Sequence, residues 1–338
     1  MDEVLNIEGL SVYYKTQNGE SKAVDRVSLT VYPNEMLGIA GESGSGKSTL
    51  VGGIMRLIKP PGYVPAGRVL FTYRENGREV KVDLLQVPEN DLRKIRWRHI
   101  SYIPQGSMNS LNPVTKIKEQ MTDVIMEHSG KSRAEANALV PELLRGVDLR
   151  PDVAEMYPHE LSGGMKQRVI IAMALALEPE LVIADEPTTA LDVVNQLSVL
   201  SMLFKVCRKI NASLILITHD MAVHAQLVDR VAIMYAGRMM EVGYTPEIFR
   251  HPLHPYTEGL LTSIPSIDID GERKRLEGIS GLAPSPISWP PGCRFHPRCP
   301  RASTECSMNE PAMIEHERQH YVACFLYGGV TGDAATRS

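Results

Sequence analysis

Residues 41–48, Gly-Glu-Ser-Gly-Ser-Gly-Lys-Ser, have the types and the spacing of a loop that binds phosphate. Glycines let backbone N–H groups close around phosphate oxygens, and the N-terminus of a following helix adds positive potential. Lys47 would add a point charge, and Ser48 a hydroxyl ligand for Mg²⁺. The residues predicted to contact a bound nucleotide through this loop are Gly41, Glu42, Ser43, Gly44, Ser45, Gly46, Lys47, Ser48 and Thr49.

Two adjacent carboxylates, Asp185 and Glu186, follow an apolar run that begins at residue 181. Asp185 can bind the coordination shell of Mg²⁺, and Glu186 can orient or deprotonate a water molecule. Acidic residues also occur at strand ends simply as solvated caps, so the pair alone does not decide between these interpretations. Together with the phosphate-binding loop, it indicates hydrolysis of a nucleoside triphosphate.

Residues 161–168, Leu-Ser-Gly-Gly-Met-Lys-Gln-Arg, resemble the signature sequence of the ATP-binding cassette (ABC) ATPases, which ordinary kinases and GTPases lack. Ser162 can cap a helix running to about residue 177, and Gly163 and Gly164 would let another molecule's phosphates approach its positive end. The alternative is a capped helix whose glycines serve close packing. The predicted signature residues are Leu161, Ser162, Gly163, Gly164 and Met165.

The resemblance covers residues 1–250 and implies that two cassettes pair head to tail, each ATP lying between one chain's phosphate-binding loop and the other chain's signature. Gln105 resembles the Q-loop glutamine, Asp192 the D-loop aspartate in the run 190–192, and His219 the switch histidine that contacts the γ-phosphate. Tyr14 lies where the family stacks an aromatic ring on adenine, with Tyr13 on the opposite face of the strand as the alternative. The implied catalytic residues are Glu186, His219 and Gln105, and the implied Mg²⁺ ligands are Ser48, Gln105 and Asp185.

Four cysteines gather near the C-terminus, after the run His-Pro-Leu-His-Pro-Tyr-Thr at residues 251–257. Both features resemble the C-terminal region of ATPases that serve oligopeptide and dipeptide importers. The resemblance implies a [4Fe-4S] cluster on Cys293, Cys299, Cys306 and Cys324, which supply the required ligand number. Zinc is an alternative, although the closely spaced C-x₂₋₄-C pair usual in structural zinc sites is missing, and unliganded thiols are another. Cys207 is interpreted as a small buried hydrophobe.

The elements that must position these residues follow from the apolar patterns. The dipeptide Asn76-Gly77, which tolerates positive φ angles, separates two β-rich runs and predicts a hairpin in an antiparallel lobe. A long helical pattern follows. Two nearly continuous apolar runs joined by a helical stretch predict buried parallel strands with a crossover helix. The predicted strands are 5–14, 24–31, 35–40, 68–73, 80–84, 181–184 and 213–218, and the predicted helices include 47–57, 134–144 and 193–209.

The predicted fold class is therefore α/β: a P-loop NTPase core of the ABC ATPase type, with a RecA-like mixed sheet and an antiparallel β lobe. A helical subdomain is inserted at about residues 107–177, and a loop-rich, metal-binding C-terminal extension follows. We place the ATPase domain at residues 1–250 and the extension at 251–338, where proline and cysteine become frequent.

Composition excludes several classes of protein. The chain has 338 residues, 43% hydrophobic and 22% charged, which is a globular balance far from that of disordered chains. Its net charge of -4 gives no support for broad binding to nucleic acid. No apolar run reaches the roughly 20 residues of a membrane helix, and the acidic N-terminus does not resemble a secretory signal, so a cytosolic protein is expected.

The leading hypothesis is an ATP-hydrolysing subunit of an ABC importer, located peripherally on the cytoplasmic face of the cell membrane. The resemblance implies a second ATPase subunit, taken as a paralogue in a heterodimer, two membrane-spanning permease subunits, an external solute-binding protein and no nucleic acid. The cargo would be oligopeptides or dipeptides, with oligosaccharides or nickel as alternatives.

Two other classes of function fit the motifs less well. A soluble cassette ATPase of translation would usually carry two cassettes in one chain, and one of DNA repair would need a long coiled coil between Lys47 and Leu161, where there is no room. An iron-sulfur electron-transfer protein would not need a complete set of hydrolysis motifs.

Overall fold

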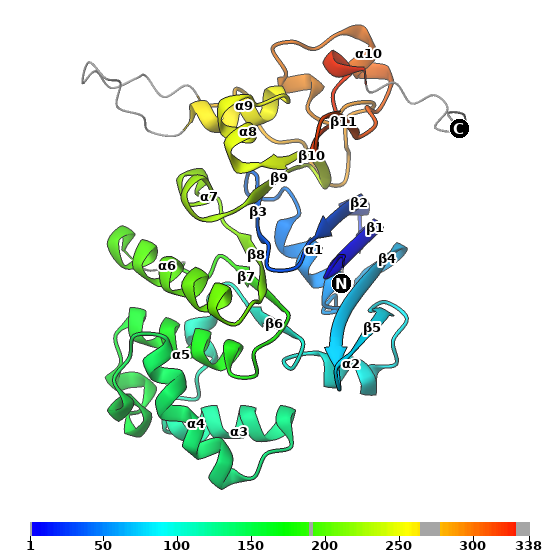
Figure 1. Ribbon diagram of the computed structural model, residues 1–338. Coiled ribbons are helices and arrows are strands. Elements are labelled where there is room, and N and C mark those ends of the chain that lie inside the picture. The colour runs from blue at the N-terminus through cyan, green and yellow to red at the C-terminus, as the bar shows by residue number, and fades with distance from the viewer. Residues whose placement is uncertain (1, 189–191, 264–277, 329–338) are drawn as a thin grey trace, which may run out of the picture. The chain divides into compact units, whose positions relative to one another are not determined.

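The computed structural model describes residues 2–188, 192–263 and 278–328 (Figure 1). The chain forms two compact units. The first unit comprises Met1–Asn6, Thr30–Met36 and Leu70–Ile217, and the second comprises Ile7–Leu29, Leu37–Val69 and Thr218–Ser338. Within the described residues, no helix has the length and apolar character needed to cross a membrane. The expected boundary near residue 250 stays a prediction.

In the first unit, three short parallel strands are paired in the order β8, β7, β6; the apolar runs predict β7 and β8, whereas β6 was not predicted. The pairing aligns Ile100 with Leu181 and Leu181 with Ser213, and every residue of β7 and β8 is buried. Parallel strands covered on both faces need such continuous apolar runs. The bounds are Ile100–Ile103 for β6, Leu181–Asp185 for β7, Ser213–Ile217 for β8 and Val193–Lys209 for α6, the predicted crossover helix.

The predicted helical subdomain is present in the same unit, where α3, α4 and α5 pack together (Figure 1). A capping box starts α4: Ser132 Oγ accepts from the Glu135 N–H at 3.3 Å, and the Glu135 carboxylate accepts from the Ser132 N–H at 2.8 Å. The elements of the subdomain are η1 (Ser107–Ser110), α3 (Ile117–Ser129), α4 (Arg133–Gly146), η2 (Pro151–Glu155), η3 (Pro158–Glu160) and α5 (Gly163–Leu175), and α2 (Glu89–Ile95) precedes it.

The predicted hairpin closes at Asn76 and Gly77, whose φ angles of 51° and 77° are those of a type I′ turn. It joins the end of β4 (Gly62–Glu75) to β5 (Arg78–Asp83), with Glu75 opposite Arg78. In the second unit, the earlier part of β4 follows β1 (Leu5–Thr16) and β2 (Gly19–Val31) in the order β2, β1, β4. These strands form the expected β lobe.

The second unit also contains a mixed sheet in the order β3, β9, β10, β12, β11. Strand β3 runs parallel to β9, and the remaining neighbours are antiparallel. The strands are β3 (Met36–Ala40), β9 (Arg230–Tyr235), β10 (Arg238–Tyr244), β11 (Ile314–Glu317) and β12 (His320–Val322). The C-terminal extension therefore contributes two strands that its loop-rich composition did not predict.

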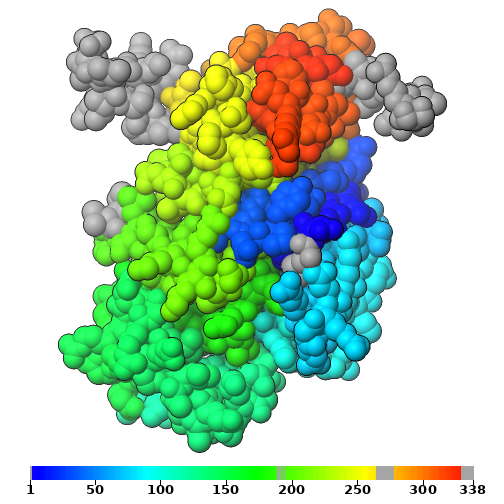
Figure 2. Space-filling view, viewed as in Figure 1, coloured from blue at the N-terminus to red at the C-terminus, as the bar shows by residue number. Residues whose placement is uncertain are grey.

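Short helices complete this unit. Figure 2 shows the orange and red residues of the extension packed against the yellow segment around α8 and α9. The helices are α1 (Lys47–Ile54), α7 (Met221–Leu227), α8 (Thr245–Arg250), α9 (Pro255–Thr262), η4 (His296–Arg298), α10 (Thr304–Met308) and η5 (Phe325–Tyr327).

A buried carboxylate, Glu241 of β10, fixes the start of the extension and its last strand. It accepts from the N–H groups of Leu253 and His254 at 2.8 and 2.9 Å, and it lies 2.7 Å from His320 Nε2. A fully buried carboxylate is stable only when its oxygens are hydrogen-bonded in this way. The extension is thus ordered in part by a polar anchor on the neighbouring sheet.

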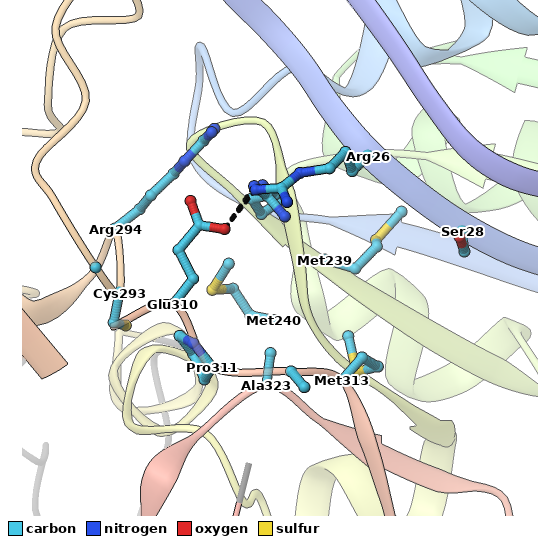
Figure 3. Close-up of a pocket in the computed structure, with 13 residues that line it drawn as sticks. Arg26, Ser28, Met239, Met240, Cys293, Arg294, Glu310, Pro311, Met313 and Ala323 are labelled. Carbon is cyan, nitrogen blue, oxygen red and sulfur yellow. Dashed lines mark hydrogen bonds and ion pairs between the residues drawn. The ribbon is translucent and has the colours of Figure 1, made fainter. Parts of the chain in front are cut away.

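A second anchor surrounds a cavity of about 250 Å³ beside Cys293, drawn in Figure 3. Arg294 and Arg238 both pair with Asp25 of β2, and Arg238 also lies 2.9 Å from Glu310. Although burial opposes ionisation of Asp25, the positive charge of Arg238, a hydrogen bond from Tyr13 and the charge of Arg294 lower its pKa. These guanidinium groups therefore tie the extension to β2 and β10.

Candidate active site

The phosphate-binding loop, residues 41–48, has a backbone that only glycine can adopt at two positions. Gly41 and Gly46 have φ angles of 149° and 105°. A Cβ atom at Gly41 would lie 2.1 Å from the Met234 carbonyl oxygen, and one at Gly46 would lie 2.3 Å from the Ala23 carbonyl oxygen. The loop therefore packs tightly on strands β2 and β9, as a rigid phosphate cradle requires.

The side chain of Lys47, the first residue of α1, bridges several residues of this loop. Its Nζ donates to the carbonyl oxygens of Gly41 and Glu42 at 2.7 and 2.9 Å, and to Ser45 Oγ at 3.3 Å. The Ser45 carbonyl in turn accepts from the Gly237 N–H at 2.9 Å. The N-terminus of α1 therefore has exposed residues such as Ser48 at its surface and the Lys47 charge beneath them. This arrangement favours binding of an anion.

Tyr13 and Tyr14 differ in their surroundings as expected for neighbours on a strand. The Tyr13 hydroxyl donates to Asp25 at 2.8 Å, and its ring packs edge-on against Tyr63. The Tyr14 ring lies beside Gly62, where a Cβ atom would meet its Cε1 at 2.6 Å. Tyr13 is therefore engaged within the β lobe, while stacking of Tyr14 on adenine stays a prediction.

The predicted catalytic carboxylates lie at the carboxyl end of β7. Asp185 is 1% exposed, and burial together with the Asp185 charge raises the pKa of Tyr102 to about 12. Glu186 has a left-handed backbone, with φ 44°, and its N–H donates to the Ile217 carbonyl. Gln105 Nε2, in the loop after β6, donates to the Glu186 carboxylate at 3.0 Å. The structure thus brings Gln105 and Glu186 together.

The signature residues begin helix α5, as predicted. Ser162 is the N-cap, and its Oγ accepts from the Met165 N–H at 3.3 Å. Ser162 and Gly163 are exposed, and a Cβ atom at Gly164 would meet no other atom within 4 Å. The helix N-terminus is accordingly open to an approaching anion. A close-packing role for Gly164 does not fit this open space.

The remaining predicted residues lie at loops. His219 is exposed and lies two residues after the end of β8. Asp192 is the N-cap of α6 and accepts from the Asn195 N–H at 3.1 Å, while residues 190 and 191 of the predicted D-loop lie outside the described residues. The catalytic role of His219 and the D-loop role of Asp192 stay predictions.

His224 is a positioning residue that the sequence motifs did not identify. It is fully buried, which lowers its pKa to about 4, and its Nε2 lies 3.2 Å from the carbonyl oxygen of Thr218, the residue before His219. A Cβ atom at Gly38 of β3 would lie 2.2 Å from its Nδ1. The neutral imidazole therefore holds the loop of His219 against β3.

The four C-terminal cysteines line one cavity together with His254 and Phe295. Burial raises the pKa of Cys293 to about 11, and the nearby thiols of Cys306, Cys324 and Cys299 add to this. Across the described parts of the chain, however, no three His, Cys, Asp or Glu side chains are arranged to hold a metal ion. The metal-binding part of the predicted fold and the iron-sulfur prediction are therefore not confirmed.

Family models match both parts of the chain. The ABC transporter model matches residues 24–189, and the model of the oligopeptide/dipeptide transporter C-terminal region matches residues 240–306. The oligopeptide transport ATP-binding protein AppD of Bacillus subtilis is 43% identical over 97% of this chain and 98% of its own length. The oligopeptide transport ATP-binding protein OppD of Escherichia coli is 42% identical over 96% of this chain and 93% of its own.

A solved structure shares the cassette fold. The dimeric post-hydrolysis state of the ATP-binding cassette MJ0796, bound to ADP and Pi, matches with a TM-score of 0.60 and 28% identity over 71% of this chain and 98% of that chain. The relatives extend this likeness through both matched regions and over nearly the full length. The chain therefore belongs to the ABC ATPases, as an ATP-binding subunit of the oligopeptide and dipeptide transporter type.

Proposed function

We propose that this chain hydrolyses ATP to power import of peptides through separate membrane-spanning subunits. The observation that carries the proposal is the Gln105–Glu186 pair, a candidate water-activating group at the carboxyl end of β7, in a chain that also holds a closed phosphate-binding loop. The relatives named as oligopeptide and dipeptide transport ATP-binding proteins support peptides as the cargo. Oligosaccharides and nickel are the alternatives to be tested.

The chemistry assigned to the residues is in-line phosphoryl transfer to water. The N–H groups of the phosphate-binding loop and Lys47 would hold the β- and γ-phosphates, and Tyr14 would stack on adenine. Mg²⁺, held through Ser48, Gln105 and Asp185, would neutralise phosphate charge. Glu186 would take a proton as the water oxygen bonds to the γ-phosphorus and the bond to the ADP oxygen breaks. His219 would contact the γ-phosphate.

We further propose that the site is completed by a second cassette, whose capped signature faces this chain's ATP. The open N-terminus of α5 supports this arrangement, and the similar cassette MJ0796 was solved as a dimer. The partner would be a paralogue, and closure of the pair would drive two permease subunits at the cytoplasmic face of the membrane. An external solute-binding protein would deliver the cargo.

Purification of the tagged chain with its native membrane complex tests this function. We expect a second ATPase chain and two permease subunits to copurify, and the reconstituted complex to take up labelled oligopeptide only with ATP. A Lys47→Ala complex should assemble but not transport. Uptake of labelled oligosaccharide or nickel in place of peptide would reassign the cargo, and a chain that purifies alone with full ATPase activity would contradict the proposal.

We propose that Cys293, Cys299, Cys306 and Cys324 hold a [4Fe-4S] cluster as a structural cross-link of the extension. Support comes from the four thiols that share one cavity. Burial raises the pKa of Cys293, Cys299 and Cys324, so their thiolates become favourable only when a cation binds them. The bound group would join three short segments of an extension that is rich in proline.

Anaerobic purification tests the cluster. We expect a brown protein with broad visible absorbance and about four iron atoms per chain, the iron content of one [4Fe-4S] cluster held by four thiolates. Cys299→Ser should lose the colour, whereas Cys207→Ala, which removes a buried thiol of α6 outside the cavity, should keep it. A colourless protein with stoichiometric zinc would overturn the cluster in favour of a zinc site.

A further inference from the structure

The phosphate-binding loop contains an acidic side chain, Glu42, that is clamped by the C-terminal extension. Arg298 Nη1 and Nη2 donate to the two carboxylate oxygens of Glu42 at 2.6 and 2.9 Å. The side chain of Arg298 is 6% exposed and that of Glu42 is 29% exposed. The two parallel hydrogen bonds make the pair geometrically specific. The pair is also strong, because both charges are largely removed from water.

The guanidinium group of Arg298 is itself held in place by other groups of the second unit. Its Nε donates to the Ser280 carbonyl at 3.0 Å, and its Nη2 reaches the Ile279 carbonyl at 3.3 Å. Its Nη1 also donates to the Tyr235 hydroxyl at 3.3 Å. Arg298 is therefore positioned before it meets Glu42, so little conformational freedom is lost in forming the pair.

The backbone of Glu42 is fixed by a second residue of the extension, Tyr256. The Glu42 N–H donates to the Tyr256 hydroxyl oxygen at 2.8 Å. Tyr256 is fully buried, and its ring packs against Tyr235 and Phe295 with centroid separations of 4.6 and 5.3 Å. Phe295 also lines the cavity of the four cysteines. Both the backbone and the side chain of Glu42 thus depend on the extension.

The position of Glu42 matters because the loop must accept a polyanion. Lys47 Nζ bonds to the Glu42 carbonyl, so movement of Glu42 would also shift the lysine. An unpaired carboxylate in the loop would repel a triphosphate, and this repulsion falls slowly with distance in a partly buried site. A neutralising group is therefore needed if Glu42 is to lie in a loop that binds ATP.

We propose that Arg298 is a positioning residue for nucleotide binding: it neutralises Glu42 and, with Tyr256, holds the phosphate-binding loop in the shape that accepts ATP. The C-terminal extension then sets the affinity of the ATPase domain for nucleotide. This inference rests on the proposed function, because it takes ATP as the ligand of the loop.

Equilibrium binding of ATP and ADP to the full chain tests the proposal. Arg298→Ala should weaken ATP binding by on the order of tenfold and ADP binding by less, because the triphosphate carries more charge. The loss should shrink at high salt, which screens the exposed part of the repulsion. Arg298→Lys keeps the charge but loses the fork, and should give an intermediate loss.

The decisive variant is the double change Glu42→Gln with Arg298→Ala, which removes the charge that Arg298 neutralises. We expect its ATP affinity to return to within about twofold of Glu42→Gln alone, the coupling that a double-mutant cycle measures. Arg318→Ala, an exposed arginine in the turn between β11 and β12, is the matched control and should bind ATP like the wild type. Thermal unfolding without nucleotide checks that every variant is folded.

Two outcomes would overturn the inference. One is wild-type ATP affinity in folded Arg298→Ala, and the other is an equal loss of ATP and ADP that Glu42→Gln does not rescue, which would make the pair merely structural. Failure of the proposed function is distinguishable, since the wild-type complex would then take up no peptide, whereas the ATP affinities of the variants can be measured whatever the cargo.

Discussion

Replacing Glu186 with glutamine should lower the ATP turnover of the assembled ATPase by about 10²- to 10⁴-fold, the usual contribution of general acid–base assistance. ATP binding should remain. The amide is nearly isosteric and keeps an oxygen that can accept from Gln105 Nε2, the contact seen at 3.0 Å with the carboxylate. It cannot take a proton from water, so the change removes the base without removing the loop geometry.

Single-turnover hydrolysis and equilibrium ATP binding, measured on the same preparation, separate these effects. Glu178→Gln makes the same chemical change at an exposed residue after α5 and should leave turnover unchanged. Wild-type turnover in the Glu186→Gln protein would refute the assignment of Glu186 as the base. Loss of ATP affinity without a chemical defect would instead place Glu186 in binding.

Local patterns predicted the elements that carry the catalytic motifs. The apolar runs of β7 and β8 and the helical stretch of α6 coincide with the observed elements, because a buried parallel strand has to be apolar on both faces. The cap at Ser162 was predicted for a similar reason: a serine followed by two glycines and a helical pattern satisfies the first N–H groups of a helix.

The contacts of the extension could not be predicted in this way. Strands β11 and β12 exist because β12 pairs with β10, placing Val322 beside Glu241, and periodicity within the tail gives no sign of such a remote partner. The pair of Glu42 and Arg298 spans 256 positions of the chain. The motif assigned Glu42 to nucleotide contact, whereas its carboxylate is occupied by Arg298. The four cysteines indicated the number of ligands, but their spacing did not show whether the thiols bind a metal.

The signature prediction leads to a second large effect. Gly164→Asp should lower ATP turnover of the complex with the second cassette by on the order of 10²-fold, comparable with removal of one donor to a developing anion. A carboxylate in the first turn of α5 would repel the phosphates bound to the partner. The free energy of unfolding should not fall, since a side chain at Gly164 meets open space and an acidic residue in the first turn interacts favourably with the helix dipole.

If Gly164 served only packing, Gly164→Asp would lower stability. Unchanged or raised stability together with lost activity would instead indicate that Gly164 belongs to a site shared with the partner. Gly164→Asn has nearly the same shape without the charge and should lose much less turnover. ATP affinity of the isolated chain should be unchanged in both variants, because its own phosphate-binding loop is untouched. Full turnover in the Gly164→Asp complex would mean that no phosphate approaches α5, and equal losses in the Asp and Asn variants would mean that bulk, rather than charge, closes the site.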